Sequence, residues 1–356
     1  MPDVYGRRMD RAALMRRVGS MEQMAYVRPF TYGEGRANGV KAFDVSNGTG
    51  LDFTVLESKG MDMVGMRYKG MNLHYAPKSG TVSPALADMN GTEFMRAISG
   101  GMLYTCGLLN VGNACEDEGT GHPFHGRMKT TPAEQISVDC GWEGDEYILR
   151  LSGQMREAAI FGDNLVLKRS IATSVGSKSV RIRDVVENQG FEAQQLMLLY
   201  HINIGFPILD EGSRLLLPSR ELLARDETSE AHAADFDRLA GPIDGFREHV
   251  YRHRPAAGSA GYTGAAVVNP RLGLGVYIKY DTRQLPYLVQ WKSMRSGDYA
   301  IGLMPSTCFV KGRAFERAQG TLLPIAPMTA LSFELEIGVI EGETDIQAFE
   351  KFVEGL

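Results

Sequence analysis

The sequence has little that would place the chain in a membrane or on a nucleic acid. Its longest apolar runs, such as residues 196–200 and 285–289, fall far short of the ~20 residues that span a bilayer. The formal net charge is -5, and no segment gathers lysine and arginine into the basic stripe that binds a phosphate backbone. The four cysteines lie far apart with no C-x-x-C pair, which predicts reduced thiols in a cytoplasmic protein. We therefore expect no membrane segment and no nucleic-acid partner.

Several motifs of cofactor-dependent enzymes are also missing. The chain has no G-x-x-x-x-G-K-[ST] loop, no G-x-G-x-x-G at the start of a helix and no H-E-x-x-H pair. No serine stands in a G-x-S-x-G turn. These absences argue against nucleotide-driven, dinucleotide-dependent and zincin chemistry. The leading expectation is a protein with no cofactor and no bound metal.

From about Gly33 onward the sequence consists of short apolar segments separated by turn signals. Residues 51–56 and 178–186 alternate apolar and polar side chains, as strands with one face in a core do. No strand-then-helix alternation indicates a parallel sheet. Helix is expected near the N-terminus, in residues 219–240 and after Thr344. The predicted fold class is all-β, with antiparallel sheets and a few short helices.

The length of 356 residues is compatible with one large all-β domain. We expect a single domain over residues 21–345, an N-terminal extension over residues 1–20 and a C-terminal tail over residues 346–356. The arginine-rich extension predicts a solvated helix that ends near Gly19. A mitochondrial presequence is the less favoured alternative, because the segment also carries acidic residues.

The first polar cluster lies in residues 121–134, where two histidines, an arginine and a glutamate follow one another closely. His125 and Arg127 are its candidate functional residues. A surface loop with incidental charge is an equally strong interpretation, and His122 is expected to be a residue of that kind.

The second cluster ends a strongly apolar strand and contains His201 and Asn203. A period of two places both side chains on one face of the sheet. Two unmatched polar groups in a packed core would cost about 1 to 3 kcal/mol each, so a cleft is the favoured location. A hydrogen-bonded core histidine is the alternative.

The third cluster covers residues 285–292, where Trp291 stands beside Lys292. An aromatic ring next to a hydrogen-bonding side chain is common in sugar sites. A structural tryptophan in the core is an equally good interpretation of this segment alone.

These clusters, together with residues 58–63 and 100–108, resemble aldose 1-epimerase-like proteins of the galactose mutarotase class, in a group of the DUF4432 type. The similarity covers about residues 18–340. It implies an antiparallel supersandwich with a sugar site on its concave face. It also implies that His125 binds the sugar, that His201 protonates the ring oxygen, and that Arg127 and Asn203 hold hydroxyl groups. Further candidates for sugar contacts are Arg96, Trp291 and Lys292.

The chain departs from this family where a catalytic base is expected. Relatives would read G-L-E-P, whereas residues 302–305 read G-L-M-P, so that Met304 takes the position of the base. A thioether cannot usefully accept a proton. Losing a positioned base costs on the order of 100- to 10,000-fold in rate if nothing replaces it. The substitute favoured here is Glu316, with Glu134, Asp298 and His125 as alternatives.

Three hypotheses follow. The leading one is an isomerase that opens the ring of a free aldose or related sugar by acid–base catalysis, as a mutarotase or a related epimerase. The second is a non-catalytic sugar-binding or regulatory protein on the same scaffold, motivated by Met304. The third is a metal site that uses His125, His201 and a carboxylate. In the first two the partner is a small-molecule sugar, and a homodimer is left open.

Overall fold

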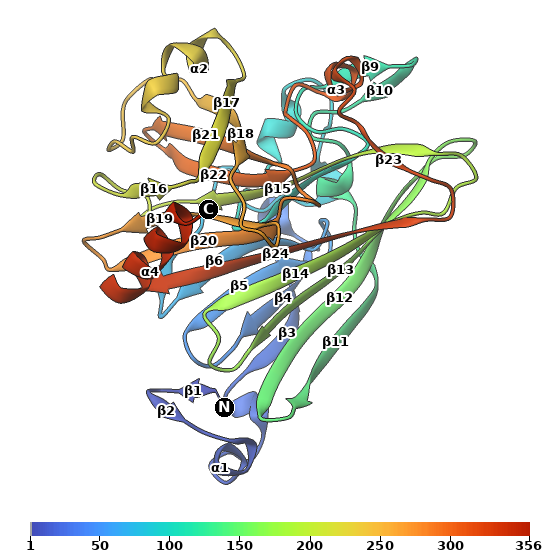
Figure 1. The fold of residues 1–356 in the computed structure, drawn as a ribbon. Coiled ribbons are helices and arrows are strands. Elements are labelled where there is room, and N and C mark those ends of the chain that lie inside the picture. The colour runs from blue at the N-terminus through green and yellow to red at the C-terminus, as the bar shows by residue number, and fades with distance from the viewer. Residues whose placement is uncertain (1) are drawn as a thin grey trace.

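Antiparallel sheets of eight, seven and five strands form the body of the protein (Figure 1), and its four α-helices are short. The computed structural model describes residues 2–356. The predicted all-β class with a few short helices is confirmed.

The eight-stranded sheet joins the middle of the chain to its C-terminal part. The late strand β24 lies between β14 and β20, so it closes the sheet across a large sequence separation. Along β14, side chains alternate between buried and exposed positions, as the sequence pattern predicted. In order, the strands are β11 (Glu134–Glu143), β12 (Glu146–Ala158), β13 (Asn164–Ser174), β14 (Ser179–Asn188), β24 (Ala330–Glu341), β20 (Leu274–Asp281), β19 (Tyr262–Asn269) and β16 (Arg214–Leu216).

The seven-stranded sheet carries the candidate site. Its central strand β15 pairs with β22 on one edge and with β8 and β23 on the other. The strands are β17 (Ser219–Ala224), β18 (His249–Pro255), β21 (Tyr287–Arg295), β22 (Asp298–Ser306), β15 (Gln194–Ile204) and β23 (Leu323–Ile325), with β8 (Tyr104–Leu108) added beside β15.

The remaining elements are a five-stranded sheet, two small hairpins and the helices. Residues 3–15 form a short hairpin and one short helix, at the bottom of Figure 1, in place of the helix ending near Gly19 that the sequence predicted. The sheet contains β3 (Tyr26–Thr31), β4 (Lys41–Ser46), β5 (Leu51–Leu56), β6 (Asp62–Tyr68) and β7 (Met71–Asn72); the hairpins are β1 (Asp3–Val4) with β2 (Arg7–Arg8) and β9 (Cys115–Asp117) with β10 (Thr120–His122); the helices are α1 (Arg11–Met15), α2 (Glu227–Ala231), α3 (Arg313–Gln319) and α4 (Glu343–Glu354).

One helix prediction is mostly wrong. Of residues 219–240, only α2 is α-helical, and β17 occupies the first part of the segment. The E-L-L-A sequence favours helix locally, but β17 pairs with β18, and this tertiary contact overrides the weak intrinsic preference. Helix after Thr344 is confirmed by α4.

The two faces of the seven-stranded sheet pack into different apolar clusters. On β15, Leu198, Tyr200 and Ile202 point into the main core between the sheets. Leu199 points the other way, into a smaller cluster that also contains Met304. Because side chains alternate along a strand, His201 has the same orientation as Leu199. It therefore lies on the face turned away from the main core.

A fully buried polar network supports the strands β15 and β8. Arg169 of β13 binds both carboxylate oxygens of Asp184 at 2.9 and 2.6 Å, and Tyr200 donates to the same carboxylate at 2.8 Å. Arg169 also donates to the Thr105 hydroxyl at 2.8 Å, and this hydroxyl donates to Asp62 at 2.6 Å. Because Tyr200 and Thr105 directly precede or follow residues of the site, the network fixes β15 and β8 relative to the eight-stranded sheet.

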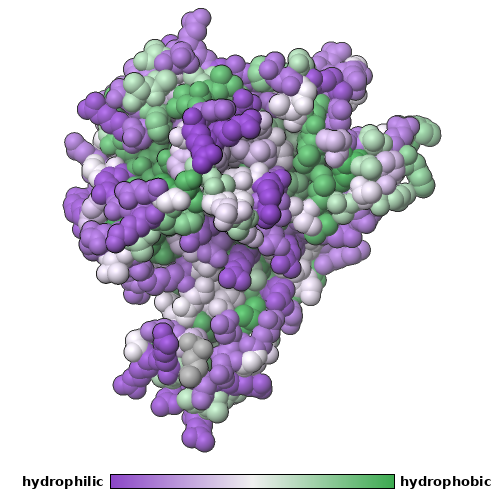
Figure 2. Space-filling view, viewed as in Figure 1, coloured by the Kyte–Doolittle hydropathy of each residue, from purple (hydrophilic) through white to green (hydrophobic). Residues whose placement is uncertain are grey.

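The face seen in Figure 2 is mostly hydrophilic, with apolar atoms at its right-hand end, where turns of the long sheet project. Ile160, Phe161 and Phe191 are exposed in such turns and do not line the groove described below. Within residues 2–356, no helix is both long and apolar enough to cross a bilayer.

Candidate active site

His201 lies near the end of β15 in a row of paired strands. It pairs with Tyr104 of β8, and the register with β22 (Leu199 with Ser306, Asn203 with Gly302) places Met304 across from it on the other side. A hypothetical Cβ on Gly302 would lie 3.1 Å from the His201 ring and 3.4 Å from the Met304 methyl group. The glycine therefore leaves the space in which the histidine and the thioether meet.

His125 reaches the same place from a strained turn. Its φ is +56°, and the following Gly126 has a φ of +73°, where a Cβ would lie 2.2 Å from the Gly107 carbonyl oxygen. Lys129 donates to the carbonyls of Phe124 and Gly126, on either side of the histidine. Left-handed backbone at a non-glycine residue costs about 1 to 3 kcal/mol and is typical of functional sites.

The tautomer of His125 follows from its contacts. Its Nδ1 accepts a hydrogen bond from the Gly112 N–H at 3.1 Å, so the proton of the neutral ring is on Nε2. Burial, and then the neighbouring His201, hold the pKa of His125 well below its usual value. At neutral pH this ring is an uncharged donor.

His201 is also neutral at physiological pH. Burial lowers its pKa to about 4, and Asn203 offsets part of that shift. Within residues 2–356, its buried Nδ1 and the Oδ1 of Asn203 have no hydrogen-bond partner. Such atoms each cost about 1 to 3 kcal/mol unless water or a ligand satisfies them.

Aromatic rings surround the two histidines. The rings of His125 and His201 are 6.0 Å apart, and Tyr104 lies edge-on to both, at 6.5 and 6.2 Å. On the open side, the ring of Trp291 is 5.8 Å from His201 and 6.1 Å from Tyr75. Together these rings form the inner wall of the site.

A groove of about 930 Å³ opens from this wall between the seven-stranded sheet and residues 75–98. Trp291 and Tyr75 are in its lining, and Trp291 contacts His201, so the groove reaches the histidines at these rings, its inner end; neither histidine lines the groove itself. Its volume is in the range of small-molecule sites. The lining also includes charged side chains, namely Arg36, Lys78, Glu93, Arg96, Arg225, Asp226, Arg247, Glu248, Arg295 and Asp298.

A second hollow, of about 660 Å³, lies on the outer face of the eight-stranded sheet. Cross-strand ion pairs such as Arg181 with Glu336 and Arg183 with Glu334 fill its surface. These pairs are what a solvated sheet face requires, and none of the predicted site residues lines the hollow, whereas Arg96 and Trp291 line the groove. The groove at Trp291 is therefore the better candidate site.

Trp291 holds a carboxylate that the sequence interpretation missed. Its Nε1 donates to Glu248 at 2.7 Å, and Arg225 donates to the same carboxylate at 2.8 Å. Val250 pairs with Trp291, and Glu248 stands two residues before it, on the same face. The alternation of residues 249–253 is a signal for the strand β18 but not for its pairing with β21, which positions Glu248.

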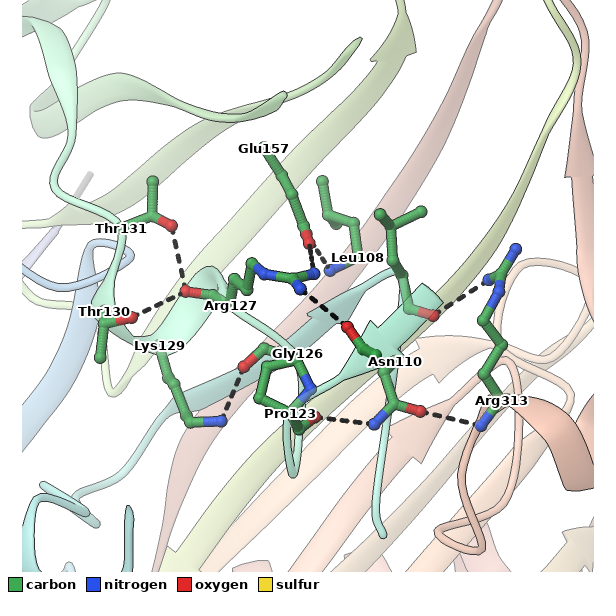
Figure 3. A network of polar contacts seen from close by, with 12 residues as sticks. Leu108, Asn110, Pro123, Gly126, Arg127, Lys129, Thr130, Thr131, Glu157 and Arg313 are labelled. Atoms are coloured by element: carbon green, nitrogen blue, oxygen red, sulfur yellow. Dashed lines mark hydrogen bonds and ion pairs between the residues drawn. The ribbon is translucent and has the colours of Figure 1, made fainter. Parts of the chain in front are cut away.

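Three predicted residues are turned away from the groove. The Arg127 guanidinium binds Glu157 and the Gly121 carbonyl (Figure 3). Lys292 follows Trp291 in β21, so its side chain points to the opposite face of the sheet. There its ammonium donates to the carbonyls of Asp235 and Arg238.

Glu316 is the third, and it does not supply a base to this site. It is fully buried in α3, where one carboxylate oxygen accepts from the Phe309 N–H at 3.1 Å and the other from Thr321. Both oxygens are used to hold the turn around the helix, and the residue does not line the groove. Its role is structural.

The other predicted residues lie in or beside the groove. Arg96 lines it and pairs with Glu93 at 3.1 Å. Asn203 lies on the same face as His201 and is almost fully buried, with its amide donating to the Gly101 carbonyl at 3.1 Å. His122 lies outside the groove lining, but it is buried in the hairpin strand β10 and is not the surface-loop residue that the sequence interpretation expected.

Within residues 2–356, no three His, Cys, Asp or Glu side chains are grouped as metal ligands. The structure therefore supplies no ligand set for the metal-dependent hypothesis. All four cysteines are free thiols.

The fold is that of galactose mutarotase-like proteins. A candidate aldose 1-epimerase from Klebsiella pneumoniae superposes with a TM-score of 0.90 at 25% identity, over 94% of this chain and 90% of that one. A galactose mutarotase-like protein from Clostridium acetobutylicum superposes with a TM-score of 0.64 at 13% identity, over 90% and 99% of the two chains. A galactose 1-epimerase from Lactobacillus acidophilus gives 0.59 at 12% identity, over 90% and 100%.

The chain belongs to the family described as a domain of unknown function, DUF4432, whose model matches residues 37–339. No curated protein sequence matches this chain.

Proposed function

We propose that this protein binds a free aldose, or a closely related sugar, in the groove and interconverts its anomers by acid–base opening of the ring. The observation that carries the proposal is the pair of uncharged histidines, His125 and His201, behind the groove, where the ring of His201 contacts Trp291 of the groove lining. The likeness to proteins named as aldose 1-epimerases supports this reaction class.

The groove offers what a sugar needs for binding. The rings of Trp291 and Tyr75 present apolar surface for the C–H face of a pyranose. Arg96 supplies polar groups for hydroxyls. The Nε2–H of His125 and the unpartnered Nδ1 of His201 supply a donor and a further polar atom at the inner end.

Ring opening moves two protons. One leaves the anomeric hydroxyl, another reaches the ring oxygen, and the bond between the anomeric carbon and the ring oxygen breaks to give the aldehyde. His201 is the proposed proton donor to the ring oxygen, and His125 holds the sugar through its Nε2–H. Because burial lowers the pKa of His201 to about 4, its imidazolium form is a strong acid toward an oxygen of the substrate.

The activity is tested by NMR exchange spectroscopy on a panel of free sugars. Exchange between anomers above the buffer rate is expected for at least one sugar, and no enhancement for any of them contradicts the proposal. Binding is followed separately by fluorescence. In a Trp142→Phe variant Trp291 is the one remaining tryptophan, and a sugar in the groove should change its emission.

One observation favours a second function, a non-catalytic sugar-binding or regulatory protein. Met304 lies across from His201, where its methyl group leaves no proton acceptor. This function predicts a fluorescence response without anomer exchange, so the two measurements on the wild-type protein separate the two candidates.

A further inference from the structure

The proposed reaction needs a proton acceptor, and the position across from His201 does not provide one. Met304 is almost fully buried and packs among apolar neighbours in the smaller apolar cluster. An acceptor must therefore come from a carboxylate that lines the groove. Four carboxylates do so: Glu93, Asp226, Glu248 and Asp298.

Asp226 is held in place as the N-terminal cap of α2. One of its oxygens accepts from the backbone N–H and the hydroxyl of Ser229 at 2.8 and 2.9 Å. The other accepts from Arg225 at 2.8 Å. Moving this carboxylate toward a ligand would release the cap, which typically stabilises a helix by about 1 kcal/mol.

Asp298 and Glu93 are held by cations of the groove. Asp298 is at the β21–β22 turn, where Lys78 binds it at 2.8 Å and the Tyr75 hydroxyl donates to it at 3.3 Å. Glu93 pairs with its exposed neighbour Arg96, and half of its side chain is exposed. Neither carboxylate contacts a ring that touches His201.

Glu248 does contact such a ring. The Trp291 N–H binds one of its oxygens at 2.7 Å, and the same indole lies 5.8 Å from His201, centroid to centroid. Arg225 binds the other oxygen at 2.8 Å. A carboxylate has about four acceptor positions, so these two contacts orient the group and leave free positions for a substrate hydroxyl.

We infer that Glu248 is the catalytic base of this site, held by Trp291 and Arg225, and that it takes over the proton transfer that Met304 cannot perform. The inference rests on the proposed function. Glu248 accepts the proton of the anomeric hydroxyl while His201 gives one to the ring oxygen, and the C–O bond of the ring breaks. When the ring closes on the other face of the aldehyde, both protons return, so no other reactant is needed.

The test compares Glu248→Gln with the wild-type protein by NMR anomer exchange, on the sugar that the wild type turns over fastest. Glutamine keeps the size and an acceptor for the Trp291 N–H, but it cannot take up the proton. We expect kcat to fall by about 100-fold or more, while the sugar Kd from Trp291 fluorescence changes by less than about fivefold. The matched control is Glu221→Gln on β17, whose carboxylate is exposed and pairs with Arg254.

A second variant guards against loss of folding. Glu248→Ala should recover part of its rate when formate is added, because formate can occupy the vacated space as an external base, whereas Glu221→Gln should not respond. Thermal melts of each variant check that the fold persists.

The outcomes separate this inference from the proposed function. If the wild type exchanges no sugar, the proposed function fails and the base assignment fails with it. If the wild type is active and Glu248→Gln keeps more than a third of its kcat, the assignment of Glu248 as the base is refuted and the proposed function stands. A loss of sugar affinity that matches the loss in rate would also refute it, because Glu248 would then be a binding residue.

Discussion

The imidazole rings of His125 and His201 lie 6.0 Å apart and nearly perpendicular, at 85°. Their hydrogen bonding differs, since Nδ1 of His125 accepts from the Gly112 backbone whereas Nδ1 of His201 has no partner within residues 2–356. A charge on one ring would disfavour a charge on the other, and His201 contributes to the lowered pKa of His125. The two residues are therefore suited to different tasks, one fixed as a donor and one free to exchange a proton.

His201→Gln tests the proton-donor assignment. We expect kcat to fall by about 100- to 10,000-fold with the sugar Kd little changed. In the wild type, kcat/KM should rise as the pH falls from 7 toward 5, because more His201 becomes imidazolium as the pH approaches its pKa of about 4. This rise should disappear in the variant. A variant that keeps the rise would place the donor elsewhere.

Acid should destabilise the folded protein. Burial lowers the pKa values of His201 and His253 to about 4, whereas an unfolded histidine takes up its proton near pH 6.5. Between these values the unfolded chain binds more protons, so the free energy of unfolding decreases as the pH falls from about 6.5 to about 4. Each histidine contributes on the order of 3 kcal/mol over this window.

Asp62 acts in the opposite direction. Burial raises its pKa to about 6, so its contribution to stability is complete below about pH 4 and is lost as the pH rises through 6. Denaturant unfolding at pH 7, 6 and 5 measures the net effect. Because the buried histidines with lowered pKa values, which include His125, outnumber the buried carboxyls with raised pKa values, Asp62 and Glu157, a net loss of stability toward pH 5 is expected, and stability that is flat or higher at pH 5 would contradict it.

Lys129→Met should loosen the turn that carries His125. The lysine is buried, burial lowers its pKa to about 7, and it donates to the carbonyls on either side of the histidine (Figure 3 shows the contact with Gly126). Each carbonyl left without a donor costs about 1 to 3 kcal/mol. We expect a lower melting temperature and weaker sugar binding. The control Lys168→Met removes an exposed pair with Glu187 and should change stability by less than about 1 kcal/mol.

The presence of antiparallel strands and the position of His201 and Asn203 on one face could be predicted from the sequence, because both follow from the local period of two. Trp291 and Lys292 were predicted as a pair, although the same period places neighbouring residues on opposite faces. The position of Glu248 could not be predicted in this way. It depends on the pairing of β18 with β21, a contact between distant segments that leaves no local pattern.

Arg127 and Glu316 show the same limit. Both lie in polar segments close in sequence to candidate residues, but Arg127 is drawn to the buried Glu157 of β12, and Glu316 is drawn to backbone donors around its own helix. Partners that become neighbours only after folding decided their orientation.

Arg169→Met tests the network behind the site. The substitution keeps an apolar stem of similar length but leaves the buried carboxylates of Asp184 and Asp62 without their cation. Breaking a buried pair in this way costs about 3 to 5 kcal/mol. Denaturant unfolding should show this loss. A change below about 1 kcal/mol would mean that the network does not hold the sheets together.

The two candidate functions predict different results for Met304→Glu. Met304 is 2% exposed and packs in the smaller apolar cluster, so a carboxylate there should lower the free energy of unfolding by about 1 to 3 kcal/mol. If Glu248 already serves as the base, the wild type is active and the new carboxylate should raise kcat by less than about tenfold. If the protein only binds sugar, Met304→Glu should create anomer exchange where the wild type has none. Met304→Gln, which introduces polarity without a base, should reproduce the loss of stability and none of the gain in rate.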